Sequence, residues 1–179
     1  GPRRGVNTHP GPMVRQAHHE ALILSLSKDD KEKEPAMNDM DRMLIEHECR
    51  KLMLNYCQHV DHLAPDAFAN LFTEDAFYNP AAHPEMNGRA EILEWIKAYP
   101  KNRRARHCSV NQIVEVIDAD NATGTSYAMV FRQENPVEGT PSPNVAPRAV
   151  VEYRDKFRRT TEGWRIAERQ YQYDFLQAE

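Results

Sequence analysis

The second half of the chain contains four long segments with the composition of β-strands, and these segments constrain the fold most. They span residues 104–117, 122–134, 148–159 and 163–175. The short sequences DADNA and TTEG join the first two and the last two segments, which predicts two β-hairpins. The connection between the hairpins, NPVEGTPSPNVAP, contains four prolines and cannot be the interior of a strand. We expect a long loop there, and long loops in compact domains often act as lids.

Helical patterns precede the strands. One apolar stripe predicts a helix that is capped by Asp39 or Asp41 and runs to about Val60. The stripe residues recur at intervals of three and four: Ile45, Cys49, Leu52, Tyr56 and Val60.

Two shorter helices and a short strand follow the first helix. The sequence APDAFANLF places Pro65 at a first helical position, and EDAFYNP is typical of a short strand. The sequence GRAEILEWIKAYP predicts a helix that begins after Gly88 and ends before Pro100. Helices first, strands last and hairpin connections together predict an α+β fold with a mostly antiparallel sheet.

Residues 1–36 lack the periodicity of a folded segment. They begin with Gly1-Pro2, which is typical of a cleaved tag, and end with the charge run KDDKEKEP. The sequence MVRQAHHEALILSLSKD is similar to a short bacterial repeat element that is sometimes translated. We expect a disordered or non-native extension over residues 1–36 and one folded domain over residues 37–179. The alternatives are a targeting peptide and a helix over residues 14–27 that docks on a neighbour.

Charge and cysteine content exclude several classes of protein. The net charge of -4 argues against nucleic acid or an anionic membrane as the main partner. The longest apolar run, ALILSL, is far shorter than the roughly 18 residues of a membrane span. The three cysteines argue against a disulfide framework, since Cys49 and Cys57 lie about 12 Å apart on one helix. A reducing cytoplasm is the expected location.

The segment RRARHCSVNQIVEV carries polar residues where a buried strand would carry apolar ones. Because successive strand residues point to opposite faces, His107, Ser109 and Asn111 should share one face. Cys108, Val110 and Val114 should share the other. The polar row predicts one wall of a cavity whose other wall is the first helix. The apolar face opposite also needs cover, and a second copy of the chain is the simplest cover. We therefore expect a homo-oligomer, either a dimer or a trimer.

Several motifs between residues 41 and 176 resemble the SnoaL-like branch of the NTF2-like superfamily. They are YCQHVDHLAPDAFANLFTEDAFY, GRAEILEWI, RARHCSVN, ATGTSYAMVFR and VVEYRDKFRRTTEGWRIAERQYQ. The resemblance implies a cone, in which a curved sheet wraps round three N-terminal helices and a deep apolar pocket. Its members include dehydratases, a dehydrochlorinase, a diarylpropane lyase and a steroid isomerase. Others are non-catalytic, such as the small subunits of aromatic-ring dioxygenases.

The resemblance also implies a set of catalytic residues. Several cofactor-free members use an Asp at the end of the first helix and a His early in the first long strand, and Asp61 and His107 match these positions. Tyr56 and Arg169 match a tyrosine and a pocket arginine of a bile acid dehydratase. The chain departs from scytalone dehydratase at Ser126, where that enzyme has a second histidine. It also lacks the second acid of steroid isomerase.

The chemistry of these residues fits such a role. Imidazole groups exchange protons near neutral pH, and a carboxylate bonded to one ring nitrogen fixes the tautomer. Asp61 is also poorly placed against the helix dipole, which disfavours anions at a helix C-terminus. Tyr56 and Arg169 have two readings each, because Tyr56 can simply pack in the core and Arg169 can simply stack on aromatic rings.

Aromatic side chains are expected to line the pocket and to suit an aromatic or polycyclic ligand. The candidates for substrate contacts are Tyr78, Trp95, Asn111, Tyr127, Phe131 and Tyr171. A metal site built from His59, His62 and His83 is the less favoured alternative, because further ligands are missing. The sequence also lacks a glycine-rich phosphate loop, so we expect no metal and no organic cofactor.

These observations favour a cofactor-independent lyase. His107, held by Asp61, would remove a proton from a hydrophobic, aromatic or phenolic small molecule, and water, halide or formaldehyde would leave. Tyr56 or Arg169 would donate to the leaving oxygen or stabilise it. The alternatives are a non-catalytic binding or assembly subunit, and an isomerase or cyclase that uses the same pair.

Overall fold

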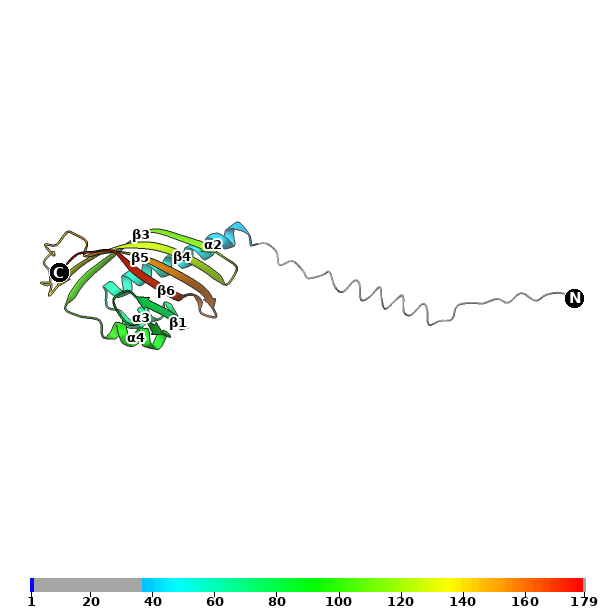
Figure 1. Cartoon of the computed structure of the whole chain (residues 1–179), viewed down its shortest axis with the longest axis horizontal. Helices are drawn as coiled ribbons and strands as arrows, with labels where there is room; N and C mark the ends of the chain where they lie inside the picture. The colour runs from blue at the N-terminus through cyan, green and yellow to red at the C-terminus, as the bar shows by residue number, and fades with distance from the viewer. Residues whose placement is uncertain (2–36, 179) are drawn as a thin grey trace. The chain divides into compact units, whose positions relative to one another are not determined.

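The computed structural model describes Gly1 and residues 37–178. The predictions for residues 2–36 fall on a segment outside the described residues. From residue 37 onward, helices pack against one curved sheet, and the longest helix crosses its concave side (Figure 1). The helices are α2 (Asp39–Asp61), α3 (Pro65–Ala69) and α4 (Arg89–Lys97).

The sheet is mixed, open and six-stranded, as the α+β prediction requires. Its order is β2-β1-β6-β5-β4-β3, and β1 runs parallel to β6 while the other neighbours are antiparallel. The strands are β1 (Phe72–Pro80), β2 (Met86–Asn87), β3 (Arg103–Val116), β4 (Asn121–Glu134), β5 (Ala149–Thr160) and β6 (Gly163–Leu176). The four long strands begin and end within one residue of their predicted positions. The two-residue strand β2 is too short to leave a sequence pattern.

Helix α2 buries the predicted apolar stripe against the sheet, but its N-terminal cap differs from the prediction. The cap is Asn38, whose side-chain oxygen accepts a hydrogen bond from the Asp41 backbone nitrogen at 2.9 Å. Asp39 and Asp41 lie in the first turn instead, where a negative charge is favourable to the helix dipole. The predicted caps were therefore wrong, because Asp39 and Asp41 lie one and three residues after the observed cap.

A β-bulge in β3 changes the predicted facing of its residues. The register with β4 shifts between Val110 and Ile113, so that one extra residue stands on β3. Asn111 adopts a left-handed backbone conformation there, with φ of 52°. Because the extra residue resets the alternation, Asn111 is exposed, and Val114 is buried on the same side as His107. The prediction that Asn111 faces the cavity and Val114 faces away was wrong for this reason.

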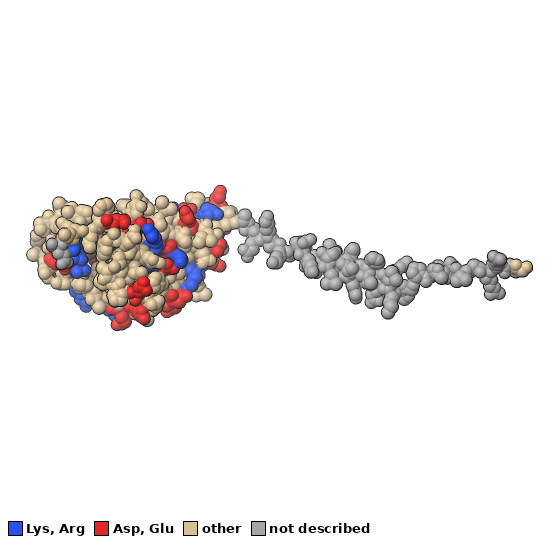
Figure 2. Space-filling model, in the orientation of Figure 1, with Lys and Arg blue, Asp and Glu red and all other residues tan. Residues whose placement is uncertain are grey.

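Apolar side chains remain exposed on the outer face of β3 and β4. Val110 and Ile113 on β3 and Tyr127 and Met129 on β4 each keep more than a third of their surface accessible. Lysine and arginine side chains are interspersed with aspartate and glutamate over the visible face of the described residues (Figure 2). None of the described helices is both long and apolar enough to cross a membrane.

The homo-oligomer stays a prediction, and the outer face supplies its test. A Tyr127→Glu, Met129→Glu double variant should lower the molar mass in solution to that of one chain, because charges would replace the apolar contact area. Size-exclusion chromatography with light scattering measures this. The control is Val145→Glu, at an 85% exposed loop position, which should leave the mass unchanged. A wild-type chain that is already monomeric would contradict the prediction.

Candidate active site

A cavity of about 280 Å³ lies between the concave side of the sheet and the helices. Its wall is strongly aromatic, because it includes six of the seven tyrosines of the chain. The aromatic wall residues are Tyr56, Tyr78, Trp95, Tyr99, Tyr153, Tyr171 and Tyr173. A larger hollow of about 440 Å³ lies on the outer face, but its wall offers surface charges such as the Lys156–Glu168 pair and no histidine. The inner cavity is therefore the candidate site.

The predicted contact between Asp61 and His107 is confirmed. Asp61 Oδ1 lies 2.6 Å from His107 Nδ1, and Asp61 Oδ2 accepts a second hydrogen bond from the His107 backbone nitrogen at 2.8 Å. A carboxylate can only accept, so Nδ1 donates, and in the neutral imidazole Nε2 then carries the lone pair. His107 lines the cavity, and both side chains are at most 10% exposed. The hydrogen bond to Asp61 thus fixes the imidazole ring so that His107 can act as a base toward a molecule bound in the cavity.

The end of α2 brings Asp61 to the strand. The helix ends in a Schellman motif, in which Ala64 donates to the His59 carbonyl at 3.0 Å and Leu63 donates to the Val60 carbonyl. Leu63 adopts the left-handed conformation, with φ of 51°, where glycine is usual. This tight ending stops the helix at Asp61, so that the carboxylate projects from its last turn toward β3.

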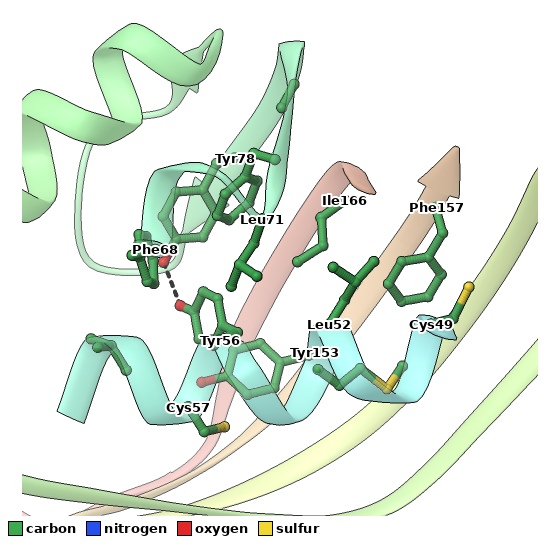
Figure 3. Close-up of a cluster of buried hydrophobic side chains, with 14 of the residues drawn as sticks. Cys49, Leu52, Tyr56, Cys57, Phe68, Leu71, Tyr78, Tyr153, Phe157 and Ile166 are labelled. Carbon is green, nitrogen blue, oxygen red and sulfur yellow. Dashed lines mark hydrogen bonds between the residues drawn. The ribbon is translucent and has the colours of Figure 1, made fainter. Parts of the chain in front are cut away.

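Tyr56 lies five residues before Asp61 and points to a different part of the site. Its hydroxyl lies 2.7 Å from the hydroxyl of Tyr78, and both residues line the cavity. Figure 3 marks this hydrogen bond with a dashed line between the two side chains. Burial raises the pKa of Tyr56, an effect that the nearby Arg169 charge partly opposes. Burial likewise raises the pKa of Tyr78 well above its ordinary value. Both groups are therefore neutral hydroxyls at neutral pH and can donate hydrogen bonds.

Arg169 is buried behind the cavity wall. Its Nε and Nη2 each donate to an oxygen of Asp155 at 2.7 Å, and the side chain is 1% exposed. Its guanidinium lies over the rings of both Tyr56 and Tyr153, at 4.0 and 4.6 Å from the ring centroids. Arg169 is absent from the cavity wall. The prediction that it touches a leaving oxygen was therefore wrong, and the stacking alternative is the one that the structure adopts.

The predicted substrate contacts divide into two groups. Tyr78, Trp95 and Tyr171 line the cavity. The other three predictions, Asn111, Tyr127 and Phe131, were wrong, since none of them reaches the cavity. Asn111 is displaced by the bulge, and Tyr127 is 41% exposed on the outer face of β4. Phe131 lies four residues further along the same face of that strand.

Two serines, Ser109 and Ser126, occupy the other polar positions of interest on β3 and β4. Ser109 accepts a hydrogen bond from the Gln112 side chain at 2.9 Å, across the bulge, rather than facing a ligand. Ser126 is 1% exposed, and its hydroxyl has no hydrogen-bond partner among the described residues. His107 is therefore the member of the polar row that reaches the cavity.

Sequence reasoning missed the arginines of the cavity. Arg103, Arg132 and Arg148 line it together with His83. The inward alternation of β3 places Arg103 on the same side as His107, which was a usable signal for that residue. Arg132 lies on β4, where the alternation that continues from Ala128 was an equally usable signal. Arg148 directly follows the proline-rich loop, where no periodicity indicates which way a side chain points.

The histidines considered for a metal do not come together. His83 packs edge-on against Trp95, with ring centroids 5.6 Å apart, and His62 Nδ1 contacts the Gln58 carbonyl. Over residues 37–178, no group of three or more histidine, cysteine or acidic side chains is arranged to hold a metal ion.

Comparison with protein families identifies the fold. A model of the SnoaL-like domain matches residues 41–170, which is most of the described chain. The chain belongs to the SnoaL-like family. No curated protein matches the sequence of this SnoaL-like protein.

Solved structures extend this result. A variant of Rv3472, a protein of unknown function from Mycobacterium tuberculosis, is 28% identical, covers 79% of each chain and has a TM-score of 0.63. An NTF2-like protein with a cystatin-like fold from Novosphingobium aromaticivorans is 27% identical, covers 76% of this chain and 87% of its own, and has a TM-score of 0.60. The hexachlorocyclohexane dehydrochlorinase LinA-type3 from Novosphingobium barchaimii is 17% identical, covers 78% and 93%, and has a TM-score of 0.64. The last likeness concerns the fold alone.

The buried Asp155–Arg169 pair should be important for stability. Replacing Arg169 with Met leaves the Asp155 carboxylate buried without a partner, which should cost about 3–5 kcal/mol of unfolding free energy. Urea denaturation measures the change. Lys156→Met is a matched control, since it removes the exposed Lys156–Glu168 pair on the neighbouring strands and should cost less than about 1 kcal/mol. Equal losses in the two variants would contradict this assignment.

Proposed function

We propose that this SnoaL-like protein is a cofactor-independent lyase that acts on a hydrophobic, aromatic or phenolic small molecule. The observation that carries the proposal is the Asp61–His107 contact, whose free imidazole nitrogen faces an aromatic cavity. A histidine held by a carboxylate is a general base of fixed tautomer, and such a base contributes ~10²–10⁴-fold to a rate. The fold shared with a dehydrochlorinase adds support at the level of architecture.

The reaction would be an elimination. His107 Nε2 takes a proton from the substrate, and the electron pair of the broken bond forms a new double bond as the leaving group departs from the neighbouring centre. Asp61 holds the ring in place and stabilises the imidazolium that forms. A halide leaves with its own electron pair and needs no proton. A hydroxyl leaving group departs as water once it receives a proton.

Tyr56 is the residue proposed to give that proton. It lines the cavity, and burial keeps its hydroxyl neutral. The hydroxyl of Tyr78, 2.7 Å away, can support the charge that develops on the Tyr56 oxygen. The Arg169 guanidinium beneath the Tyr56 ring adds a positive charge 4.0 Å away. The imidazolium of His107 then restores the proton, so the net reaction only splits water from the substrate.

The two alternative functions are a non-catalytic assembly subunit and an isomerase or cyclase, and they would use the site differently. A non-catalytic assembly subunit is favoured by the exposed apolar outer face, but it gives no role to the free imidazole nitrogen of His107 that faces the cavity. An isomerase or cyclase would use the same pair on another substrate. A screen of phenolic and alicyclic alcohols by mass spectrometry separates these possibilities, because elimination changes the product mass and isomerisation does not. The screen is run in chelator without added cofactor, which also tests the proposal that none is needed.

The Asp61–His107 pair is tested by two substitutions. His107→Ala should lose nearly all turnover, and Asp61→Asn should lose much of it, because the amide can favour the wrong tautomer and cannot stabilise the imidazolium. Both variants should still bind a product analogue. The matched control is His83→Ala, which removes a second cavity histidine that has no carboxylate partner in the described residues. A folded, fully active His107→Ala would end the mechanism proposed here.

The role of Tyr56 predicts a dependence on the leaving group. Tyr56→Phe should lower turnover by ~10²-fold or more with a substrate that loses water, since a general acid contributes on that scale. It should change turnover little with a substrate that loses halide. The two rates are measured on one preparation, with circular dichroism as a check of folding. Equal losses with both substrates would assign Tyr56 to packing instead.

A further inference from the structure

One tyrosine of the cavity wall, Tyr153, differs from its neighbours in the bonding of its hydroxyl. Three of the wall tyrosines, Tyr56, Tyr78 and Tyr153, are at most 3% exposed. The hydroxyls of Tyr56 and Tyr78 are hydrogen-bonded to each other at 2.7 Å. The Tyr153 ring contacts Tyr56 and Tyr171 edge to face and lies 4.6 Å from the Arg169 guanidinium, but its hydroxyl has no hydrogen bond to any described residue.

The Tyr153 hydroxyl is accessible from the cavity. Tyr153 belongs to the inward-facing alternation of β5, and its side chain forms part of the cavity wall. Figure 3 shows its hydroxyl pointing from β5 toward the turn of α2 that carries Cys57, and no dashed line reaches it. The fully buried side-chain oxygens without a partner in the described residues include Ser126 Oγ but not the Tyr153 oxygen. Because the Tyr153 oxygen also lacks a partner there, the cavity is the side from which one can approach it.

Packing does not explain a hydroxyl at this position. A phenylalanine would make the same ring contacts with Tyr56, Tyr171 and Arg169. The hydroxyl costs free energy when it is withdrawn from water without a hydrogen bond, and buried polar groups in native proteins are nearly always bonded. The Tyr153 hydroxyl therefore calls for a hydrogen-bond partner that a ligand of the cavity would supply.

The surroundings of Tyr153 favour a hydroxyl that donates. Burial raises the pKa of Tyr153 well above its ordinary value, and the nearby Arg169 charge opposes this only in part, so the group is protonated at neutral pH. Donation of a hydrogen bond increases the negative partial charge on the phenol oxygen. The Arg169 guanidinium beside the ring stabilises that charge. The fitting ligand group is therefore an oxygen that accepts a hydrogen bond.

Tyr153 and the base reach different parts of the cavity. His107 pairs with Val130, and Val130 pairs with Ala149, which lies four residues before Tyr153 on β5. The Cα atoms of His107 and Tyr153 are thus about 13 Å apart along the strands and about 10 Å apart across them, at ~3.3 Å per residue and ~4.8 Å per strand. Both side chains line the same cavity. One bound molecule can therefore contact the base at one point and the hydroxyl at another.

We propose that Tyr153 is a substrate-binding residue whose hydroxyl donates a hydrogen bond to an oxygen on the aromatic substrate. This oxygen is distinct from the leaving group, to which Tyr56 gives a proton. Tyr153 thus selects oxygenated aromatic molecules over hydrocarbons of the same shape. That the bound molecule is a substrate rests on the lyase function proposed above, whereas the hydrogen bond can be tested by binding alone.

The test uses two probes of nearly the same shape, acetophenone and α-methylstyrene, which carry a carbonyl oxygen and a methylene group at the same position. Their affinities for the full chain are measured by isothermal titration calorimetry. Tyr153→Phe should weaken the binding of acetophenone about threefold to tenfold, which is the loss expected for one hydrogen bond between neutral groups. It should leave the binding of α-methylstyrene unchanged. Equal changes for the two probes, an unchanged affinity for acetophenone, or no binding of acetophenone at millimolar concentration would overturn the proposal.

Thermal unfolding of the same variant distinguishes a binding role from a structural one. Tyr153→Phe should keep or raise the melting temperature, because the hydroxyl has no partner in the described residues to lose. Tyr127→Phe is the matched control, since it removes a hydroxyl from the outer face of β4, where Tyr127 is 41% exposed. It should change neither affinity. A melting temperature that falls by several degrees in Tyr153→Phe, or an equal loss of acetophenone affinity in Tyr127→Phe, would refute the assignment.

His107→Ala separates this inference from the proposed function. It should abolish turnover, while Tyr153→Phe in the His107→Ala background should still weaken acetophenone and not α-methylstyrene. Retained turnover in His107→Ala refutes the lyase mechanism but not the role of Tyr153. A wild-type protein that catalyses elimination, and whose affinity for acetophenone is the same after Tyr153→Phe, refutes the role of Tyr153 but not the mechanism.

Discussion

The double contact between Asp61 and His107 connects the two halves of the structure. It joins the last residue of α2 to β3, which is the edge strand of the sheet and therefore has only one neighbouring strand to hold it. The same carboxylate accepts from the backbone and from the imidazole, so it fixes the strand and orients the base at once. The cavity stays open because the helix ends at this contact instead of continuing across the concave side.

A second set of buried interactions supports the opposite wall. Asp155 holds Arg169, and the Arg169 guanidinium lies over the rings of Tyr56 and Tyr153, which also contact each other edge to face at 5.5 Å between centroids. Burying an ion pair is costly, and it is tolerated when good geometry and hydrogen bonds offset the loss of hydration. Here the pair has two hydrogen bonds of 2.7 Å and two aromatic faces around the cation. Tyr56 and Tyr153 are thus supported from behind by two groups that do not line the cavity.

The sequence predicted the bounds of the helices and strands well, but it predicted less well which side of the sheet each side chain faces. Strand boundaries follow turns and prolines, which are local signals, and the dyad positions followed from the family resemblance. The error at Asn111 has a physical source, since Asn111 stands at a bulge and breaks the two-residue alternation on which facing arguments depend. Tyr127 and Phe131 lie instead on the outer face of β4 by its regular alternation. The Arg169 stack needed a partner, Asp155, fourteen residues away on another strand.

The hydrogen bond from the backbone nitrogen of residue 107 to Asp61 Oδ2 does not depend on the side chain at position 107. Any residue there, proline excepted, has the N–H group that Asp61 Oδ2 accepts. The strand can therefore keep its place when the reactive group is exchanged for another. In such a scaffold the backbone contact that holds the strand is independent of the catalytic side chain. A single substitution at position 107 can therefore change the chemistry without changing the fold of the site. Such modularity would allow one cone of helices and strands to host eliminations, isomerisations and simple binding in turn.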